Sequence, residues 1–265
     1  LLLVVIALAL FICGCDKDST ELYKDNSSVQ LAYTAVEEGQ FKYAVYEDHA
    51  ELIGYTGSSK TVTVPSKAGG KTVTVIGTNA FNSTKVTSVT IPDSVTDIGA
   101  YAFYNTKLEA ITIPASVKSL GYAAFGKCTA LTAIEIPESI TRIGYYAFSG
   151  CKALTNVTLP QSLTFIGEHA FDGCSALTNI TIPANVETIE KFAFFKCSTL
   201  TDIVFSGESK LKYIGQEAFS DCKALVVFNL PASVVSIGER IFYDDEALTT
   251  FNVPADSKLE TIGDT

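Results

Sequence analysis

The chain has 265 residues, of which 47% are hydrophobic and only 18% are charged, and this balance excludes an intrinsically disordered protein. Nineteen Lys and Arg against 29 Asp and Glu give a formal net charge of −10, which argues against nucleic acid and anionic membrane surfaces as partners. Only two histidines, His49 and His169, are available for metal binding or imidazole chemistry, so an enzyme is not favoured.

The chain begins with an uncharged, apolar segment that ends at Cys13-Gly14-Cys15, just before a charged run. This segment is shorter than the roughly 20 residues that span a bilayer, but it suits the hydrophobic region of a secretory signal peptide. The charged region that opens such a peptide is missing. Residues 1–14 are therefore predicted to be a signal peptide that lacks its beginning.

Residues 12–15, Ile-Cys-Gly-Cys, resemble the bacterial lipobox, in which a small residue precedes a lipidated cysteine. The resemblance implies that Cys15 carries acyl chains and tethers the protein to a membrane, since each buried CH₂ contributes about 0.8 kcal/mol. An ordinary cleaved signal peptide, with Cys15 a bystander, is the alternative. The acidic, polar segment 15–40 is predicted to be a solvated linker behind this anchor.

Residues 41–75 alternate apolar and polar side chains between Gly-Ser and Gly-Gly turns. This alternation is typical of half-buried strands joined by tight turns. We expect a β-rich N-terminal cap here, which covers the open edge of the structure that follows.

One pattern recurs from residue 76 to the end of the chain, and in most copies a glycine is followed three residues later by Ala-Phe. A period of 20–29 residues with a Leu-x-x-Ile-x-Ile core is the signature of leucine-rich solenoids. The last copy stops partway, so the array over 76–265 is predicted to be truncated at its C-terminus. The repeat phenylalanines are separated by 22, 22, 23, 23, 23, 25 and 23 residues: Phe81, Phe103, Phe125, Phe148, Phe171, Phe194, Phe219 and Phe242.

Each position of the repeat unit that begins at Leu154 has a structural interpretation. A short strand ends at Pro160, which lacks the N–H that a further ladder bond would need. Gly167 supplies conformational freedom at a corner, and Ala170 and Phe171 fill the interior from a short helical turn. A lone coil buries too little to offset the ordering of its backbone, so the coils must stack.

Five cysteines occupy one column of the repeat, which permits either disulfides or a ladder of buried thiols. Side chains stacked at about 4.8 Å miss the roughly 3.8 Å Cβ separation of a bridge, so buried thiols are favoured. Metal binding is disfavoured because no second column of His or Cys converges on this one. The column comprises Cys128, Cys151, Cys174, Cys197 and Cys222.

The pattern IGxxAFxxCxxLxxIxIPxSVxxIG, which covers nearly all of residues 76–265, resembles the BspA-type leucine-rich repeat family. The resemblance implies a right-handed leucine-rich-repeat coil stack, β-rich with short helical turns. It also implies a secreted or surface-attached bacterial protein that adheres to host matrix proteins, glycans or other microbial surface molecules. With the lipobox, it predicts lipid anchoring at the bacterial cell surface or outer envelope, with no cofactor.

Two surfaces are candidates for ligand binding. The outward columns of the strands are dominated by threonine, although threonine is also simply a good exposed strand former. The position two residues before the repeat phenylalanine, with its neighbours, is aromatic in the middle coils. If exposed, this cluster suits protein hot spots or stacking on sugars, and partial burial is the alternative. Its members are Tyr101, Tyr104, Tyr122, Tyr145, Tyr146, His169, Phe192 and Phe195.

We expect a non-catalytic surface lipoprotein whose solenoid binds host or microbial macromolecules. Carbohydrate capture for nutrient uptake and a structural role in the envelope are alternatives. An enzyme resembling a parallel β-helix lyase or hydrolase would need carboxylates that converge in adjacent coils, whereas Glu135 stands alone in its column. No catalytic residue or metal ligand is predicted.

Overall fold

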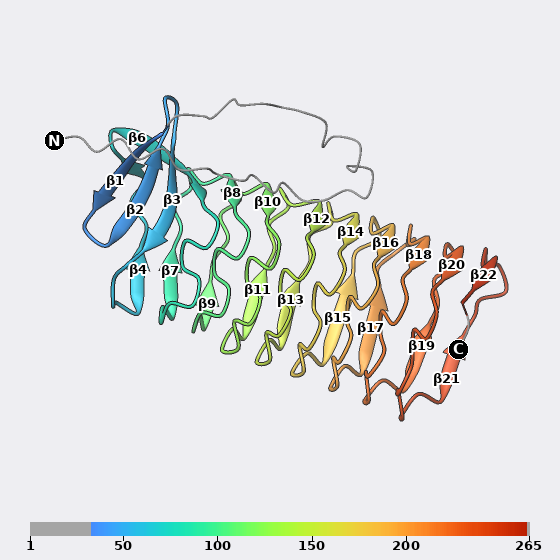
Figure 1. The fold of residues 1–265 in the computed structure, drawn as a ribbon. Helices are drawn as coiled ribbons and strands as arrows, with labels where there is room; N and C mark the ends of the chain where they lie inside the picture. Colours follow the sequence, from blue (N-terminus) through green and yellow to red (C-terminus); the bar gives the residue numbers. More distant parts are fainter. Residues whose placement is uncertain (1–32, 264–265) are drawn as a thin grey trace, which may run out of the picture.

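The computed structural model describes residues 33–263, so the predicted signal peptide, Cys15 and the linker up to residue 32 lie outside the described residues. The described residues form 22 strands and no helix. None of them belongs to a helix long and apolar enough to cross a membrane. The strands wind into an elongated stack of coils with a small sheet at its N-terminal end (Figure 1).

The N-terminal sheet begins with three antiparallel strands, β1 (Thr34–Glu38), β2 (Phe41–Val45) and β3 (Ala50–Tyr55). β3 then pairs in parallel with β6 (Lys71–Ile76), whose own hairpin partner is β5 (Lys67–Ala68). The sheet continues through β8 (Asp97–Ile98) and β10 (Ser119–Leu120) of the coil stack. The predicted β-rich cap is thus present, and it is hydrogen-bonded directly to the first coils.

Both the cap and the stack begin earlier in the chain than the sequence indicated. β1 lies within the segment predicted as linker, because its five residues pair with β2 and Glu37 forms an ion pair with Lys42 at 3.2 Å. Its side chains are mostly exposed, which explains the linker-like composition. β4 (Thr61–Thr63) pairs in parallel with the strand of the next coil, so the first coil lies inside the predicted cap.

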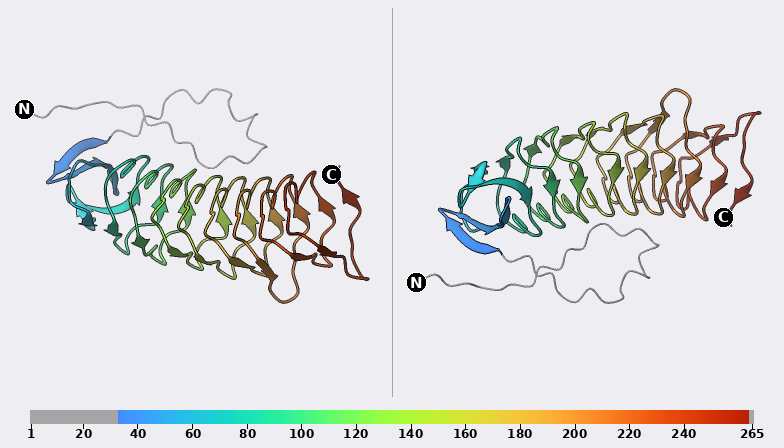
Figure 2. Two further views of the ribbon diagram at one scale, coloured as in Figure 1. Left: turned by 90° about the horizontal axis from the view of Figure 1, so that it is seen from below. Right: turned by 90° about the horizontal axis from the view of Figure 1, so that it is seen from above.

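Two rows of short parallel strands run along the stack, one strand of each row per coil (Figures 1 and 2). The first row comprises β4, β7 (Ser88–Thr90), β9 (Ala110–Ile111), β11 (Ala133–Glu135), β13 (Asn156–Thr158), β15 (Asn179–Ile182), β17 (Asp202–Phe205), β19 (Val227–Asn229) and β21 (Thr250–Asn252). The second row comprises β6, β8 (Asp97–Ile98), β10 (Ser119–Leu120), β12 (Arg142–Ile143), β14 (Phe165–Ile166), β16 (Thr188–Ile189), β18 (Tyr213–Ile214), β20 (Ser236–Ile237) and β22 (Thr261–Ile262).

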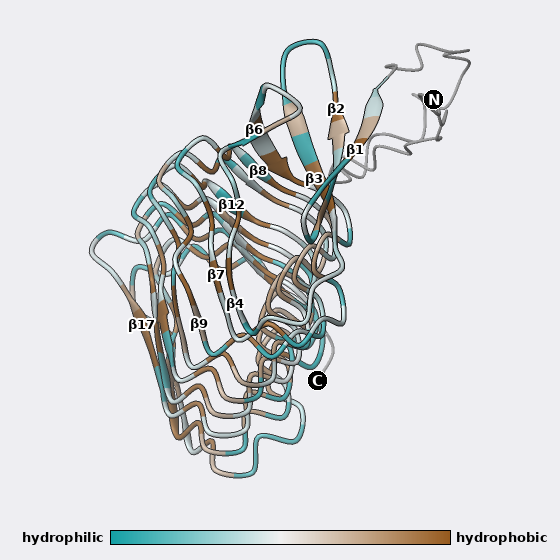
Figure 3. Ribbon diagram, turned by 90° about the vertical axis from the view of Figure 1, so that its left-hand side faces the viewer, coloured by the Kyte–Doolittle hydropathy of each residue, from teal (hydrophilic) through white to brown (hydrophobic). Residues whose placement is uncertain are grey.

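The interior of the stack is a ladder of phenylalanine rings. The rings from Phe81 to Phe219 stack face to face, with centroids 5.2–5.5 Å apart and interplanar angles of 9° or less. Tyr55 of the cap covers the first ring at 5.4 Å. Apolar residues recur at the same place in successive coils, as the view along the stack shows (Figure 3). The predicted solenoid with repeat phenylalanines in its core is confirmed.

The third side of each coil is a chain of turns, and the predicted helical turn is wrong. The residues two before and two after each repeat phenylalanine have φ near +60°, as in His169 (φ 54) and Gly173 (φ 69). Two left-handed residues, four positions apart in each turn, prevent an α-helix. The phenylalanine N–H instead donates to the following coil, as from Phe171 to the Ala193 carbonyl at 2.8 Å.

The repeat glycine lies before these turns, and its role differs from the predicted one. None of the glycines in this column has a positive φ. A Cβ on Gly167 would instead lie 2.8 Å from the Ile143 carbonyl oxygen and 2.9 Å from the backbone of Gly144. The glycine therefore permits a close approach between coils rather than an unusual dihedral angle. The absence of a positive φ is consistent with Glu190 occupying the same column in one coil.

The cysteine column is a ladder of free thiols, as predicted. All five cysteines are buried and none forms a disulfide. Each sulfur donates to the carbonyl of the repeat phenylalanine in the preceding coil at 3.1–3.4 Å. Thr84 and Thr106 replace cysteine in the first coils, and their hydroxyls donate to the phenylalanine carbonyl of their own coil. The column thus supplies hydrogen-bond donors as well as filling space.

Asp245 replaces cysteine near the end of the stack and makes stability depend on pH. Its Oδ1 accepts the Cys222 N–H at 2.8 Å, whereas its buried Oδ2 has no hydrogen-bond partner among the described residues. Burial, opposed by that hydrogen bond, raises the pKa of Asp245 to about 7. The folded protein thus keeps a proton that the unfolded chain releases near pH 4, and stability falls as the pH rises from 4 to 7.

Asp245→Asn is expected to remove this dependence. Between pH 4 and pH 8 the parent should lose about 2 kcal/mol more stability than the variant, because the half-buried carboxyl keeps part of its hydration. Urea unfolding of both proteins at the two pH values measures the difference. Asp93→Asn, an exposed site at the other end of the stack, is the control and should leave the pH dependence unchanged. Equal pH profiles for the parent and Asp245→Asn would contradict the assignment.

Candidate functional site

An outward-facing row of aromatic rings lies on the turn side of the middle coils. It follows the left-handed position two residues before the repeat phenylalanine. In the coil where this position is the small Ala123, the preceding residue, Tyr122, supplies the ring. We refer to these five rings as the aromatic column: Tyr101, Tyr122, Tyr146, His169 and Phe192.

The turn backbone holds this column in register from coil to coil. The N–H of Tyr101 donates to the Tyr122 carbonyl at 2.8 Å, and that of Tyr146 donates to the next coil in the same way at 2.9 Å. These bonds offset the cost of left-handed φ, roughly 1–2 kcal/mol per residue. The backbone does not require a ring at this position. Non-aromatic side chains adopt the same φ in the remaining coils: Asn79, Ala123, Glu217 and Arg240.

The rings contact one another along the whole column. Tyr101, Tyr122 and Tyr146 pack at tilted angles with centroids 5.2–5.3 Å apart. His169 is stacked between Tyr146 and Phe192, at 4.5 and 4.7 Å. Because neighbouring rings cover each other's faces, the column presents mainly ring edges and hydroxyl groups to solvent. Tyr122 is the most open member, with 40% of its surface exposed.

Two further rings and two lysines widen the surface. Tyr104 meets Tyr101 edge to face at 5.4 Å, and Phe195 meets Phe192 in the same way at 5.6 Å. A lysine covers each outer ring: the ammonium of Lys127 lies 5.4 Å from the Tyr104 centroid, and that of Lys196 lies 4.6 Å from Phe195. Such cation–π contacts keep the rings ordered while leaving the charges accessible.

Acidic groups surround His169 at the centre of the column. Its Nδ1 lies 3.0 Å from the Asp172 carboxylate and its Nε2 lies 3.8 Å from Glu168. Lys191 of the next coil completes the cluster, 3.2 Å from Glu168. Burial raises the pKa of Asp172, and the neighbouring His169 opposes this shift.

Two tyrosines of the column, Tyr122 and Tyr146, are neutral at physiological pH. Burial, together with the negative charge of Tyr101 and Tyr146 when these ionise, raises the pKa of Tyr122 to about 12. Burial and the nearby Glu168 also raise the pKa of Tyr146. The phenols therefore remain protonated and can donate hydrogen bonds to a partner.

The structure brings together seven of the eight predicted binding residues. The exception is Tyr145, which instead meets the Phe165 ring at 6.4 Å, in a separate cluster where Arg142 lies 3.8 Å over that ring. The two predicted alternatives, exposure and partial burial, prove to be combined, since all members except Tyr122 are half-buried. The flanking Lys127 and Lys196 were not predicted, although each stands two residues after a repeat phenylalanine in the sequence.

Threonines on the first strand row divide into two kinds. Those just before the strands have hydroxyls that donate to the carbonyl of the preceding coil, as from Thr155 to Thr132 at 3.0 Å. This column is therefore structural. The hydroxyls on the outward face of the strands, including those of Thr112 and Thr158, make no hydrogen bond within the described residues. They line a shallow hollow of about 510 Å³ together with Glu135.

The aromatic column offers groups that suit the recognition of another surface. These are protonated phenols, ring edges and the ammonium groups of Lys127 and Lys196. Among residues 33–263, no group of three His, Cys, Asp or Glu side chains could hold a metal ion. Glu135 pairs in register with Thr158, so the strand row does not place a second carboxylate beside it there.

Comparisons with known proteins agree with this architecture. The model of a family described as BspA type Leucine rich repeat region matches six copies over residues 55–177 and 141–265. A leucine-rich repeat protein of T. pallidum is 29% identical, with a TM-score of 0.65; the match covers 72% of this chain and 90% of that one. The pneumococcal vaccine antigen PcpA shares the fold at 20% identity and a TM-score of 0.50, over 86% of this chain and 77% of that one. No curated protein has significant sequence similarity to the chain.

Proposed function

Because the chain belongs to the BspA-type leucine-rich repeat family, we propose that it is a non-catalytic binding protein, attached to the bacterial surface, whose aromatic column recognises proteins of a host or of other microbes. Stacked repeats give long, rigid surfaces that serve binding more readily than catalysis. Attachment through a lipid on Cys15 is part of this proposal.

The observation that carries the proposal is that the turn backbone accepts many residue types at the position of the aromatic column. Asn79 and Glu217 adopt the same left-handed conformation as Tyr146 and Phe192, so folding alone does not select aromatic side chains there. Asparagine tolerates that conformation better than a large ring does. We therefore attribute the row of aromatic rings in adjacent coils to contacts with a binding partner.

The packing of the column favours a protein partner over a sugar. Sugar rings stack on open aromatic faces, but His169 is covered on both faces by Tyr146 and Phe192. Protein hot spots use ring edges, tyrosine hydroxyls and flanking charges, all of which this surface offers. Charged side chains of both signs surround the aromatic column: Glu168, Asp172, Lys127 and Lys196.

Replacing the column is expected to abolish partner binding without unfolding the protein. The variant combines Tyr122→Ala, Tyr146→Asn and Phe192→Asn, since asparagine fits the left-handed backbone there. The full chain is applied to an array of matrix proteins and mucosal glycans at physiological salt, and the Kd of each interaction is measured. We expect binding to at least one protein, weakened at least tenfold in the variant, because hot-spot side chains contribute about 2 kcal/mol or more.

A matched control keeps this result specific. Tyr213→Ser removes a tyrosine that is 50% exposed on the second strand row, away from the turn side, and should leave the Kd unchanged. Protein binding that is equally strong in the triple variant would exclude the aromatic column as the binding surface. Binding to glycans alone would support the carbohydrate-capture alternative instead.

A further inference from the structure

Charge is distributed unevenly along the turn side of the stack, taken as the four residues before and after each repeat phenylalanine. The first four coils carry only lysines there, and no Asp or Glu. The next four coils carry nine Asp and Glu against four Lys and Arg. The turn side therefore has a basic half and an acidic half. The lysines of the basic half are Lys85, Lys107, Lys127 and Lys152.

Both halves keep charge that the fold does not neutralise. All four lysines of the basic half are exposed, and none of them forms an ion pair within residues 33–263. In the acidic half, Lys223 lies 3.2 Å from both Asp244 and Glu246. The carboxylate of Asp221 makes no hydrogen bond or ion pair in the described part of the chain. Each half can therefore attract a surface of opposite charge.

A second copy of the chain carries the same two halves and the same spacing between coils. When two turn sides meet in antiparallel orientation, the basic half of each copy faces the acidic half of the other. Parallel contact would instead set lysine against lysine in four successive coils. Charge complementarity therefore favours the antiparallel arrangement.

The charged positions also select a register between the two copies. We consider a two-fold axis that lies between the two faces and passes through the coil of Phe171. Each repeat position then faces the same repeat position of another coil. Lys127 lies opposite Asp221 of the other copy, and Lys107 lies opposite Glu246, so both outer pairs join opposite charges.

Neighbouring registers lack this complementarity. Moving the axis by half a coil towards the N-terminus would set Lys127 against Lys196 of the other copy. Moving it by a whole coil would set Lys152 against the same residue of the other copy. Like charges that face each other across an interface are unfavourable, so the register with Phe171 at the axis is preferred.

The aromatic column lies in the middle of this surface. The preferred register sets Tyr146 opposite Phe192 of the other copy, and ring edges of this kind pack well against each other. The acidic groups beside His169 lie near the axis, where they would meet their copies. They are already engaged there by the imidazole and by Lys191, which reduces the repulsion between them.

We propose that the turn side binds a second copy of this chain in antiparallel orientation. The inference rests on the proposed function, since it names a partner for the aromatic column. The antiparallel arrangement places the two N-terminal caps at opposite ends, which suits copies anchored on two facing cells. The contact is only one side of a coil wide, so it belongs with transient complexes that gain strength when many copies act together.

Sedimentation velocity of the full chain tests the inference, from about 5 to about 500 µM protein and at about 50 and about 500 mM NaCl. We expect a reversible equilibrium between monomer and dimer, with a Kd that rises at least fivefold at the higher salt because surface charges are screened. Lys127→Asp and Asp221→Lys should each raise the Kd at least fivefold. The variant that combines them should restore the parent Kd, since each reversed charge again faces its opposite.

Both substitutions fit the turn backbone. Lys127 (φ 57) and Lys196 (φ 58) occupy the same repeat position as Asp221 (φ 61) and Asp244 (φ 62). Each residue type therefore already occurs there in the left-handed conformation, and the variants should fold like the parent.

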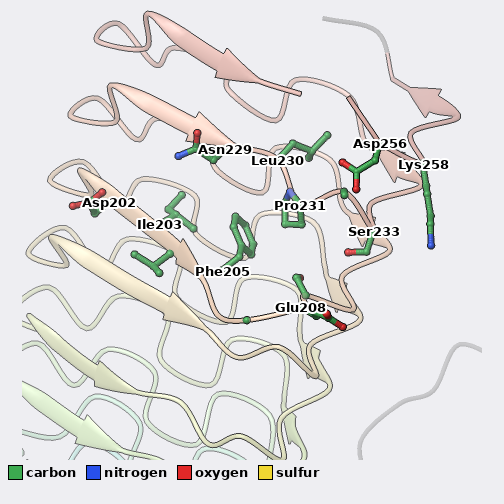
Figure 4. Close-up of a pocket in the computed structure, with 14 residues that line it drawn as sticks. Asp202, Ile203, Phe205, Glu208, Asn229, Leu230, Pro231, Ser233, Asp256 and Lys258 are labelled. Atoms are coloured by element: carbon green, nitrogen blue, oxygen red, sulfur yellow. The ribbon is translucent and has the colours of Figure 1, made fainter. Parts of the chain in front are cut away.

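Two charge reversals outside the turn side are the matched controls. Lys118→Glu changes an exposed lysine just before β10 of the second strand row. Glu208→Lys changes an exposed carboxylate at a pocket of about 700 Å³ on the first strand row (Figure 4). Neither side chain faces the other copy in the proposed arrangement, so both controls should keep the parent Kd.

A chain that stays monomeric up to about 500 µM at the lower salt would overturn the inference. A combined variant that does not recover association would overturn it as well, as would dimers that neither single reversal weakens. The result is separable from the proposed function. Binding to a protein of the array without dimer formation would leave that function standing and overturn this inference, whereas dimers without array binding would support this inference alone.

Discussion

Phe171→Ala is expected to lower the free energy of unfolding by about 3–5 kcal/mol. The Phe171 ring is fully buried and stacks on Phe148 at 5.4 Å and on Phe194 at 5.3 Å. Its removal leaves a cavity between two rings that cannot close up, because the backbone bonds between coils fix their separation. Urea unfolding followed by circular dichroism measures the loss.

The effect should depend on the position of the ring in the ladder. Phe251 near the last coil is 39% exposed, and Phe251→Ala should cost less than about 1.5 kcal/mol because little buried surface is lost. Because long repeat arrays can unfold in parts, hydrogen exchange should show the loss of protection first in the coils around residue 171. Equal costs for the two substitutions would show that the phenylalanine ladder is not the main source of stability.

Gly121→Ala should lower the free energy of unfolding by a similar amount, through a steric clash between coils rather than a cavity. A Cβ at this position would lie 2.4 Å from the Ala100 nitrogen and 2.5 Å from the Gly99 carbonyl carbon, and neither backbone atom can rotate away. The two coils must separate, which breaks the 2.7 Å bond from the Gly121 N–H to the Ile98 carbonyl. We expect a loss of at least about 3 kcal/mol or failure to fold.

Gly144→Ala provides the matched control for this contact. Gly144 occupies the same column, but its Cβ would meet only the Leu120 carbonyl oxygen at 3.1 Å, with the next atom at 3.9 Å. A shift of a few tenths of an ångström accommodates it, so the cost should stay near 1 kcal/mol. A similarly large loss in both variants would contradict the close-contact explanation, because of the two glycines only Gly121 has backbone atoms within 3 Å of the added Cβ.

The sequence was most informative where one residue type recurs at one position. The spacing of the phenylalanines was sufficient to predict the solenoid and its core, and the cysteine spacing was sufficient to predict the thiol ladder. The turn side was not predictable in the same way, because residues as different as Asn79, Ala123 and Glu217 share one left-handed conformation. Conformation there is imposed by bonds between coils rather than by local propensity.

For the candidate sites, sequence reasoning located the rings but not their arrangement. Tyr122 and Tyr146 meet although they belong to different repeat positions, because Tyr122 takes the place that Ala123 leaves empty. Tyr145, next to Tyr146 in the chain, faces the other way. The unpaired hydroxyl of Ser233 likewise appears only when the coils are stacked.

Site-specific photo-crosslinking tests the role of the aromatic column most directly. The photoreactive residue p-benzoyl-phenylalanine replaces either Tyr122 or Thr181, which is exposed on the first strand row, and each protein is irradiated with the protein partner found on the array. Binding through the aromatic column predicts a crosslink from position 122 and little or none from position 181. A crosslink from position 181 alone would contradict it and place the partner on the strand face.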